Sequence, residues 1–341
     1  MSVKSAFIVT TASGFEGEGR HEILSLISPL RVRKMFFKGT LLVESDREEG
    51  EVVEALRDAE TTYLGRVFPV DSEIRISRGR ESLGAIYDAV LGLGKLRADE
   101  TFRVHCKRRG SHDFNSRDME VAVGRSLEED PGATADLTDP EKAVVVQIFQ
   151  DIAYVGVTRS ENLLVKEVRR FRKYARGERP FTRAEFKIRE ALKAFDFEVT
   201  DDFEVLDVGA APGGWTKVLA GMAGRVVAVD PADLHPSIGE MRNVTHLRCR
   251  AEELPGDVGA FDLVTNDMNV SPEESAEIMN GLTGLLREGG SAIMTVKFVT
   301  RKRRRHVREA MRILEAEYRD FRVKRLPHNR NETTLFMRKK G

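Results

Sequence analysis

The chain has 341 residues, in which 55 Lys and Arg balance 55 Asp and Glu, so its formal net charge is zero. This length predicts two or three domains with sizeable cores, and the neutral balance excludes bulk positive charge as the source of any affinity for nucleic acid. No apolar run approaches about 18 residues and no signal peptide opens the chain, so we expect a cytoplasmic protein that binds no membrane.

The two cysteines, Cys106 and Cys249, stand far apart and lack the spacing of metal ligands. Such cysteines are typical of plain buried thiols in a reducing compartment. We therefore expect no metal site.

Residues 1–68 alternate strands and helices in the order of a small α+β domain. We expect a strand at 6–11, a helix at about 20–26, a strand pair around 35–45 and a helix at 49–57. This order is the split βαβ pattern of a ferredoxin-like domain. No residue pattern here indicates chemistry, so we expect a structural or docking module.

Residues 69–160 form a second α/β module that contains a basic turn. One of its strands ends in Lys107, Arg108 and Arg109. A helix begins soon after, with Ser116 as a plausible N-cap. A basic turn before a helix N-terminus is a good phosphate site, because exposed N–H groups and guanidinium groups converge there. A solvated surface loop is the competing interpretation.

The segments FRVHCKRRGSHDFNSRDMEVAVG and ADLTDPEKAVVVQIFQDIAYVGV of this module resemble the THUMP domain of RNA-modifying enzymes. The residues before it resemble the ferredoxin-like domain that usually accompanies a THUMP domain. The resemblance implies a module that grips structured RNA, which in the tRNA enzymes is the acceptor end. Lys107, Arg108 and Arg109 are then candidate RNA-binding residues.

Residues 161–182 are strongly basic and interleave Phe171, Tyr174 and Phe181 with the charges. The pattern predicts a linker, partly helical, that ends where Pro180 breaks the periodicity. Arginine and aromatic side chains suit the RNA backbone and unstacked bases, so we expect RNA contact here. A linker that merely covers a domain surface is the competing interpretation.

The most informative stretch is FEVLDVGAAPGGWTKVLAGMAGRVVAVD, residues 203–230. A strand, a glycine-rich turn, a helix and a second strand ending in Asp230 form half of a doubly wound nucleotide-binding unit, with Asp230 able to bind ribose hydroxyls. The turn differs from GxGxxG, and its proline fixes the backbone beside the ligand, which favours S-adenosyl-L-methionine over NAD. The expected cofactor-binding residues are Asp207, Gly209, Ala210, Ala211, Pro212, Gly213, Gly214, Trp215, Asp230 and Asp267.

The last domain, residues 183–341, continues the alternation of strands and helices. Its fourth strand ends at Asp267, and its fifth, at about 291–299, carries Lys297. A helix at about 303–318 and two closing strands follow. The pattern predicts a mostly parallel sheet with an antiparallel edge.

Lys297 stands out because a lone ammonium group lies in an apolar strand, AIMTVKFV. Burying an unpaired charge is costly, so Lys297 needs a partner or a purpose. In an open α/β sheet, ligands bind at the carboxyl ends of the strands, where Asp207, Asp230 and Asp267 also lie. Asp267 is the expected partner, and a structural ion pair is the competing interpretation.

The last domain resembles the FtsJ-like RNA ribose 2′-O-methyltransferases in DVGAAPGGWT, in Lys187, in Asp267 of NDM, in Lys297 of VKF and in Glu332 of HNRNETTLF. The resemblance implies that these lysines and acids form the family's catalytic Lys–Asp–Lys–Glu tetrad. It is greatest to the subfamily that joins a THUMP domain to this domain, typified by a bacterial enzyme that methylates a cytidine ribose of large-subunit rRNA. The expected fold is α/β, with a Rossmann-like doubly wound methyltransferase domain preceded by a ferredoxin-like α+β domain and a THUMP α/β domain.

One departure from that family concerns the adenine. Many relatives place an acidic residue after the third strand to bond the adenine amino group. Here Arg250 and Ala251 stand near that place. Backbone groups or Glu252 are the remaining candidates, and no contact is assigned.

The tetrad suits methyl transfer to a ribose 2′-hydroxyl, which is a poor nucleophile and needs positioning and help in losing its proton. Lys297 can deprotonate the 2′-oxygen or, as an ammonium, stabilise the developing alkoxide. Lys187 lowers the pKa of Lys297 by like-charge repulsion, whereas Asp267 and Glu332 raise it. The sequence leaves open which lysine is neutral at the moment of attack.

A basic run follows Lys297 at the start of the next helix. Positive charge at a helix N-terminus opposes the macrodipole, and RNA phosphates would relieve that cost. A solvated helix start is the competing interpretation. The added RNA-binding candidates are Arg301, Lys302, Arg303, Arg304 and Arg305.

The expected function is S-adenosyl-L-methionine-dependent 2′-O-methylation of RNA, with large-subunit rRNA favoured and tRNA as the alternative. A base N-methyltransferase would usually carry an Asn/Asp-Pro-Pro-aromatic motif where this chain has residues 266–269, NDMN. A cytosine C5-methyltransferase needs a cysteine nucleophile, and Cys106 and Cys249 are in neither expected place. A non-catalytic RNA-binding or assembly factor is the last alternative, but inactive relatives are expected to lose tetrad members.

Overall fold

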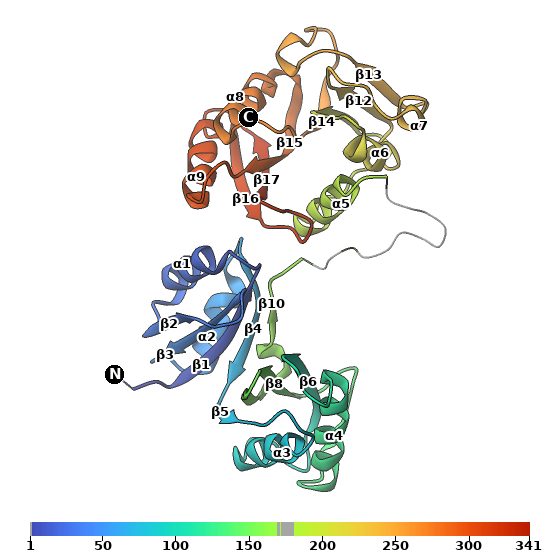
Figure 1. The fold of residues 1–341 in the computed structure, drawn as a ribbon. Helices are drawn as coiled ribbons and strands as arrows, with labels where there is room; N and C mark the ends of the chain where they lie inside the picture. The colour runs from blue at the N-terminus through green and yellow to red at the C-terminus, as the bar shows by residue number, and fades with distance from the viewer. Residues whose placement is uncertain (1, 169–170, 172–180) are drawn as a thin grey trace. The chain divides into compact units, whose positions relative to one another are not determined.

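A computed structural model describes residues 2–168, 171 and 181–341. The chain divides into two compact units, Met1–Glu167 and Val168–Gly341 (Figure 1). Among the described residues, no helix has both the length and the apolar composition that crossing a membrane requires.

The first sheet of the N-terminal unit is antiparallel and has the order β10-β4-β1-β3-β2. Its elements are β1 (Ser5–Thr11), α1 (Glu16–Ile27), β2 (Arg31–Lys34), β3 (Thr40–Ser45), α2 (Glu49–Asp58), β4 (Leu64–Val70) and β10 (Leu164–Val165). Phe7 and Val9 of β1 pack with Ile23 of α1 and Val52 of α2, so both helices cover one face. This βαββαβ order confirms the predicted ferredoxin-like fold, although the proposed division at residue 68 falls within β4.

The second sheet of this unit has the order β5-β9-β8-β6-β7. Its elements are β5 (Ser72–Arg75), α3 (Ser82–Gly92), β6 (Thr101–Arg109), α4 (Ser116–Glu129), β7 (Thr134–Ala135), β8 (Lys142–Phe149), β9 (Ile152–Arg159) and the 3₁₀ turn η1 (Ser160–Asn162). Ile86 of α3 and Met119 of α4 pack with Val146 of β8, so these helices also cover one face. Asn115, not the predicted Ser116, caps α4, because its side chain accepts two backbone N–H bonds of the first turn.

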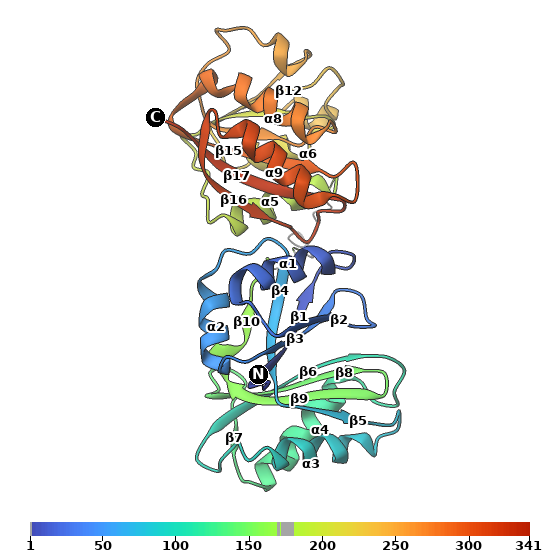
Figure 2. The same cartoon turned by 90° about the vertical axis from the view of Figure 1, so that its left-hand side faces the viewer.

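The two sheets of this unit pack together through the faces that carry no helix (Figure 2). Successive residues of a strand point to opposite faces. Ile8 therefore turns away from α1 and α2 and joins Phe68 of β4 and Val145 and Phe149 of β8 in a separate cluster. Burial of both faces explains the nearly continuous apolar run of β1.

The described part of the C-terminal unit has a seven-stranded sheet of order β13-β12-β11-β14-β15-β17-β16. Its strands are β11 (Glu204–Val208), β12 (Arg225–Val229), β13 (Val244–Leu247), β14 (Phe261–Asn266), β15 (Leu286–Lys297), β16 (Tyr318–Lys324) and β17 (Glu332–Lys339). Strands β11 to β15 are parallel, and β17 is antiparallel to both of its neighbours. This confirms the predicted Rossmann-like sheet, whose order reverses at β11 and leaves a switch point at the carboxyl ends of β11 and β14.

Helices cover both faces of this sheet (Figure 1). They are α5 (Ala184–Ala194), α6 (Gly214–Ala220), α7 (Pro236–Gly239), α8 (Pro272–Gly281) and α9 (Arg303–Leu314), with 3₁₀ turns η2 (Ala251–Glu253) and η3 (Thr283–Leu285). Helices α5 and α6 pack against Val205 and Leu263, while α8 and α9 lie on the opposite face. The predicted end of the last helix at residue 318 is wrong, because the buried Tyr318 begins β16 and its hydroxyl donates to the Met279 carbonyl at 2.8 Å.

The two cysteines differ from the prediction of full burial. Cys106 and Cys249 are free and only partly buried. Burial still raises the pKa of the Cys106 thiol to about 12. A thiol with so high a pKa is a poor nucleophile at neutral pH.

Candidate active site

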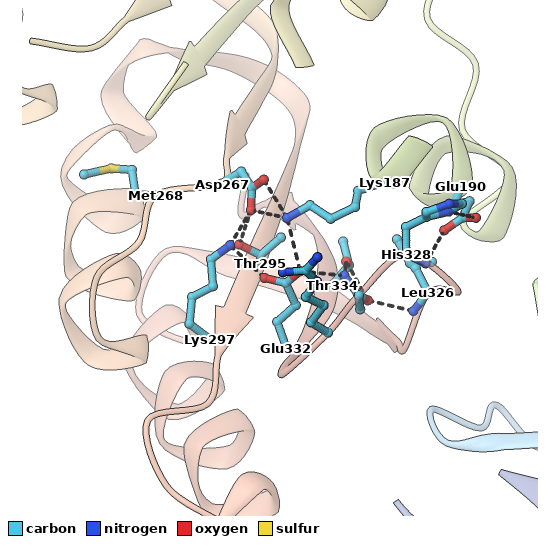
Figure 3. A network of polar contacts seen from close by, with 12 residues as sticks. Lys187, Glu190, Asp267, Met268, Thr295, Lys297, Leu326, His328, Glu332 and Thr334 are labelled. Carbon is cyan, nitrogen blue, oxygen red and sulfur yellow. Dashed lines mark hydrogen bonds and ion pairs between the residues drawn. The ribbon is translucent and has the colours of Figure 1, made fainter. Parts of the chain in front are cut away.

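Three neighbouring strands and one helix bring the predicted tetrad together (Figure 3). Asp267 directly follows β14, Lys297 ends β15 and Glu332 begins β17. The antiparallel register of β15 and β17 sets Lys297 opposite Glu332. Lys187 comes from α5, and although it lies 145 positions from Glu332 in sequence, their side chains are in contact.

Each ammonium group of the tetrad contacts both carboxylates. The Nζ of Lys187 lies 2.6 Å from the Asp267 carboxylate and 3.2 Å from Oε1 of Glu332. The Nζ of Lys297 lies 2.5 Å from Oδ1 of Asp267 and 2.7 Å from Oε2 of Glu332. Thr295, which the sequence analysis missed, donates a further bond to Oδ1 of Asp267 at 2.9 Å. Two positive and two negative charges thus close a ring.

The four side chains lie at two depths. Lys187 is 4% exposed and Glu332 is 7% exposed. Lys297 is 18% exposed and Asp267 is 16% exposed. A substrate that approaches the carboxyl ends of β14 and β15 therefore meets Lys297 and Asp267 first.

The ring shifts the pKa values of Lys297 and Glu332. Burial lowers the pKa of Lys297, but the carboxylates of Asp267 and Glu332 outweigh it, so the pKa is raised above its ordinary value. Burial raises the pKa of Glu332, but the charges of Lys187 and Lys297 outweigh it and bring the pKa down to about 2. At neutral pH Lys297 is therefore an ammonium and Glu332 a carboxylate.

A buried pair, Glu190 and His328, lies next to the tetrad and supports the segments that carry Lys187 and Glu332 (Figure 3). Glu190 lies on α5 one turn after Lys187 and is fully buried. Its carboxylate accepts the backbone N–H of His328 at 2.9 Å and lies 2.6 Å from Nδ1 of that imidazole. The Phe186 ring stacks on His328 at 4.6 Å between centroids. These contacts, which the sequence analysis signalled only as part of HNRNETTLF, join the helix of Lys187 to the loop that leads to Glu332.

The glycine-rich turn between β11 and α6 lies next to the tetrad. Gly209 and Gly213 have φ angles of +69° and +110°, which L side chains rarely adopt. A Cβ on Gly209 would lie 2.4 Å from Cγ of Met268, and one on Gly213 would lie 2.6 Å from Cδ1 of Ile238. Glycine is therefore required at both positions by the backbone conformation and by packing against Met268 and Ile238, and the approach of a cofactor to this turn stays a prediction. The other predicted turn residues are Ala210, Ala211, Pro212 and Gly214.

Asp230 lies beside this turn and is oriented by two backbone N–H groups. It follows β12 and is partly exposed. Its Oδ2 accepts the N–H of Ala211 at 3.0 Å, and its Oδ1 accepts the N–H of Ala232 at 2.8 Å. Each carboxylate oxygen has a further lone pair, so Asp230 retains acceptor capacity for ribose hydroxyls.

Asp207 and Trp215 lie beneath the turn, with exposures of only 1% and 2%. Asp207 accepts hydrogen bonds from the hydroxyls of Thr216 at 2.6 Å and Thr265 at 2.8 Å. Burial raises the pKa of Asp207 to about 7. Both residues support the turn from below, and their direct contact with a cofactor stays a prediction.

The region in which many relatives bind the adenine of the cofactor, around residues 250–252, leads into and forms η2. Ala251 is buried and Glu252 is exposed. Glu252 lines a cavity of about 530 Å³ between η2 and α8. Of the two side chains, Glu252 alone presents a polar group there, and no adenine contact is assigned.

The basic run after Lys297 surrounds the start of α9, which begins at Arg303. Arg303 is partly buried, and the other four predicted cations are exposed. They are Arg301, Lys302, Arg304 and Arg305. The first turn of α9 contains no acidic residue, so positive charge meets the positive end of the helix dipole, and an anionic partner would relieve this repulsion.

The basic run at the end of β6 is partly used within the protein. Lys107 is exposed, whereas Arg108 and Arg109 are partly buried. A guanidinium nitrogen of Arg108 lies 3.2 Å from Nδ1 of His112, and one of Arg109 donates to the carbonyl of Lys38 at 3.1 Å. Partial desolvation of the ammonium group and the charges of Arg109 and Arg66 lower the pKa of Lys107. Positive charge therefore gathers at this surface, with Lys107 as its most open member.

The predicted basic linker is described only in part. Residues 169–170 and 172–180, which include Tyr174, lie outside the described residues. Phe181 is 38% exposed, and its ring lies 4.4 Å from that of His235. RNA contact by this segment stays a prediction.

Two family models match the chain in the order that the sequence predicts. Residues 181–333 match the FtsJ-like methyltransferases, and residues 81–158 match the THUMP domain. The chain joins a THUMP domain to an FtsJ-like methyltransferase domain. This confirms the resemblance inferred from the motifs, and the FtsJ-like domain confirms S-adenosyl-L-methionine as the methyl donor.

Relatives of this THUMP–FtsJ-like chain include proteins of archaea and bacteria. An uncharacterized protein of Methanocaldococcus jannaschii is 27% identical over 99% of this chain and 100% of its own length. A ribosomal RNA large subunit methyltransferase M of Pseudomonas entomophila is 25% identical over 65% of each chain. The crystal structure of TrmN from Thermus thermophilus is 20% identical with a TM-score of 0.44, covering 98% of this chain and 100% of that one. With a THUMP and an FtsJ-like domain, the chain is an RNA methyltransferase.

Proposed function

We propose that the chain transfers a methyl group from S-adenosyl-L-methionine to a ribose 2′-hydroxyl of RNA. The tetrad carries this proposal, because each of its lysines contacts both carboxylates beside the glycine-rich turn. The ring lies at the carboxyl ends of β14 and β15, which is where an open α/β sheet binds its ligands. Lys187, Asp267, Lys297 and Glu332 are its proposed catalytic residues.

S-Adenosyl-L-methionine supplies a methyl group on a positively charged sulfur, so the chain need not activate the electrophile. The turn and Asp230 are the groups that would hold the cofactor. Lys297, as an ammonium, stabilises the negative charge that develops on the 2′-oxygen. Once Lys297 has passed a proton to solvent, its amine can take the hydroxyl proton instead. Lys187 and Glu332 lie deeper and hold Asp267 and Lys297 in place.

Other methylation chemistries find less support in the same residues. Met268 and Asn269 follow Asp267 where a base N-methyltransferase would usually have two prolines. Cys106 has a raised pKa, so its thiol is a poor candidate for attack on a cytosine. The complete tetrad argues against a non-catalytic RNA-binding factor.

We propose large-subunit rRNA as the substrate, because the Pseudomonas entomophila relative is named for that RNA and aligns with 65% of this chain. The THUMP domain makes tRNA the second candidate, because the resemblance to the tRNA enzymes implies a module that grips the acceptor end. Both substrates are compatible with the cytoplasmic location expected from the sequence.

Nucleoside mass spectrometry tests both parts of this proposal. Digested rRNA and tRNA from a deletion strain would be compared with RNA from strains that carry the wild type or Lys297→Ala. We expect a 2′-O-methylnucleoside to disappear from the large-subunit rRNA of the deletion strain and to return only with the wild type. Loss of a base-methylated nucleoside instead would refute the 2′-O assignment, and loss from tRNA would replace the proposed substrate.

A further inference from the structure

A fully exposed phenylalanine projects from the ferredoxin-like domain, in which the sequence indicated no chemistry. Phe36 lies in the loop between β2 and β3 and is 92% exposed. Its ring meets Phe37 edge to face at 5.5 Å, and Phe37 lies 5.3 Å from Phe149 at the end of β8. Single exposed apolar residues are ordinary, but Phe36 is the outer end of a row of aromatic rings that runs into the protein.

The loop that carries Phe36 is held in place on both sides. The carbonyl of Gly39 accepts the N–H of Thr11 at 2.9 Å, and the N–H of Gly39 donates to the carboxylate of Glu16. Arg109 donates to the neighbouring carbonyl of Lys38 at 3.1 Å. The exposure of Phe36 is therefore set by the fold, and a ligand that stacks on it need not first order the loop.

Lysines flank Phe36 in the chain, and an arginine lies over Phe149 at the inner end of the aromatic row. Lys34 and Lys38 are exposed on either side of it in the chain. The guanidinium of Arg109, one of the predicted RNA-binding residues, lies 5.9 Å from the centre of the Phe149 ring. The nearby carboxylate of Glu16 is occupied by the backbone N–H groups of Gly14 and Gly39. An aromatic face among cations is the combination that binds single-stranded nucleic acid, because bases stack on the ring and phosphates meet the charges.

We propose that Phe36 is a stacking platform for an unpaired RNA base, with Lys34 and Lys38 against the adjoining phosphates. Arg109 links this loop to the basic end of β6, so the ferredoxin-like and THUMP domains would share one RNA-binding surface. The inference rests on RNA as the substrate in the proposed function, but it does not depend on which atom is methylated.

Fluorescence anisotropy with the full-length protein tests this stacking. The probes are a hairpin RNA with a single-stranded tail and the same hairpin with a blunt end. Phe36→Ala should weaken binding of the tailed RNA by about 5- to 150-fold, the fold-change that corresponds to the ~1–3 kcal/mol that each stacked base contributes. Phe36→Trp should retain the affinity, and Leu137→Ala, which alters a 66% exposed residue of the same unit, should leave it unchanged.

Binding of the blunt hairpin and the slope of log affinity against log salt should not change in Phe36→Ala, because stacking releases no counterions. Wild-type affinity of Phe36→Ala for the tailed RNA would overturn the proposal and leave the loop as a protein contact. Equal weakening on both RNAs would also overturn it, because Phe36 would then shape the surface without reading a base. If the wild type binds neither RNA, both the stacking proposal and the proposed RNA substrate are refuted. An error in the proposed 2′-O position of methylation would instead be detected only by the nucleoside mass spectrometry.

Discussion

Replacing Lys297 with alanine should separate catalysis from folding. In Lys297→Ala, the carboxylates of Asp267 and Glu332 each keep Lys187 as a partner, at 2.6 and 3.2 Å. Losing one member of a buried ion pair costs about 3–5 kcal/mol when the remaining charge has no partner. Here both charges keep one, so we expect the loss of stability to stay below ~3 kcal/mol.

The effect on catalysis should be larger than the effect on stability. Removing an acid–base group typically slows a reaction by about 10²–10⁴, which is ~3–5 kcal/mol of activation free energy. Lys297→Arg should restore little activity, because a guanidinium group is bulkier and cannot deprotonate the hydroxyl. Affinity for S-adenosyl-L-methionine and RNA should stay close to that of the wild type.

Single-turnover methyl transfer, thermal unfolding and calorimetric binding of the cofactor measure these effects separately. Lys339→Ala is a matched control, because Lys339 is also 18% exposed and pairs with Glu288 at 3.3 Å at the far end of β17. The control should methylate RNA at the wild-type rate. Near wild-type transfer by Lys297→Ala would remove Lys297 from the chemistry, and the 2′-O assignment would lose its basis.

Three further variants test the cofactor turn, the buried acid beneath it and the basic run. Asp230→Ala should weaken calorimetric binding of S-adenosyl-L-methionine by about 1.5–3 kcal/mol, and unchanged affinity would exclude Asp230 from the site. Burial raises the pKa of Asp207 from 3.8 to about 7. The protonated carboxyl therefore contributes its full stabilisation below pH 3.8, and this contribution is lost as pH rises through about 7. Between about pH 5 and pH 8 the wild type should therefore lose more stability in urea unfolding than Asp207→Asn, and parallel pH profiles would contradict this. Neutralising Arg301 and Lys302 with glutamine should reduce the salt slope of RNA binding by roughly 0.7–0.9 for each phosphate that the protein no longer neutralises, and an unchanged slope would indicate a solvated helix start.

The fold class, Lys297 and Asp267 were predictable because local patterns mark them, whereas Lys187 and Glu332 were implied only by the resemblance to the FtsJ-like family. The apolar run around Lys297 signalled a buried charge, and Asp267 marked the end of the neighbouring strand. The glycines of the turn predicted a backbone conformation that other residues rarely adopt, and Gly209 has a φ angle of +69° and no room for a Cβ beside Met268. Such patterns lie within a few residues of sequence, so they can be recognised without knowledge of tertiary packing.

The remaining features depend on contacts between distant segments. Ser116 and Asn115 are both good N-cap residues, and only the backbone geometry decides between them. The pairing of Glu190 with His328 joins positions 138 residues apart, so no periodicity reveals it. Tyr318 continues the amphipathic pattern of α9 in sequence, but its burial in β16 ends the helix earlier.

The burial of β1 on both faces makes the ferredoxin-like and THUMP domains a single cooperative unit. Cutting the chain between them would expose Ile8 and Phe68 on one side and Val145 on the other, and such surfaces aggregate. The two domains should therefore melt in one transition. The shared core consequently sets the separation between Phe36 and Lys107, so the two proposed RNA contacts should be met only by an RNA whose shape matches that separation.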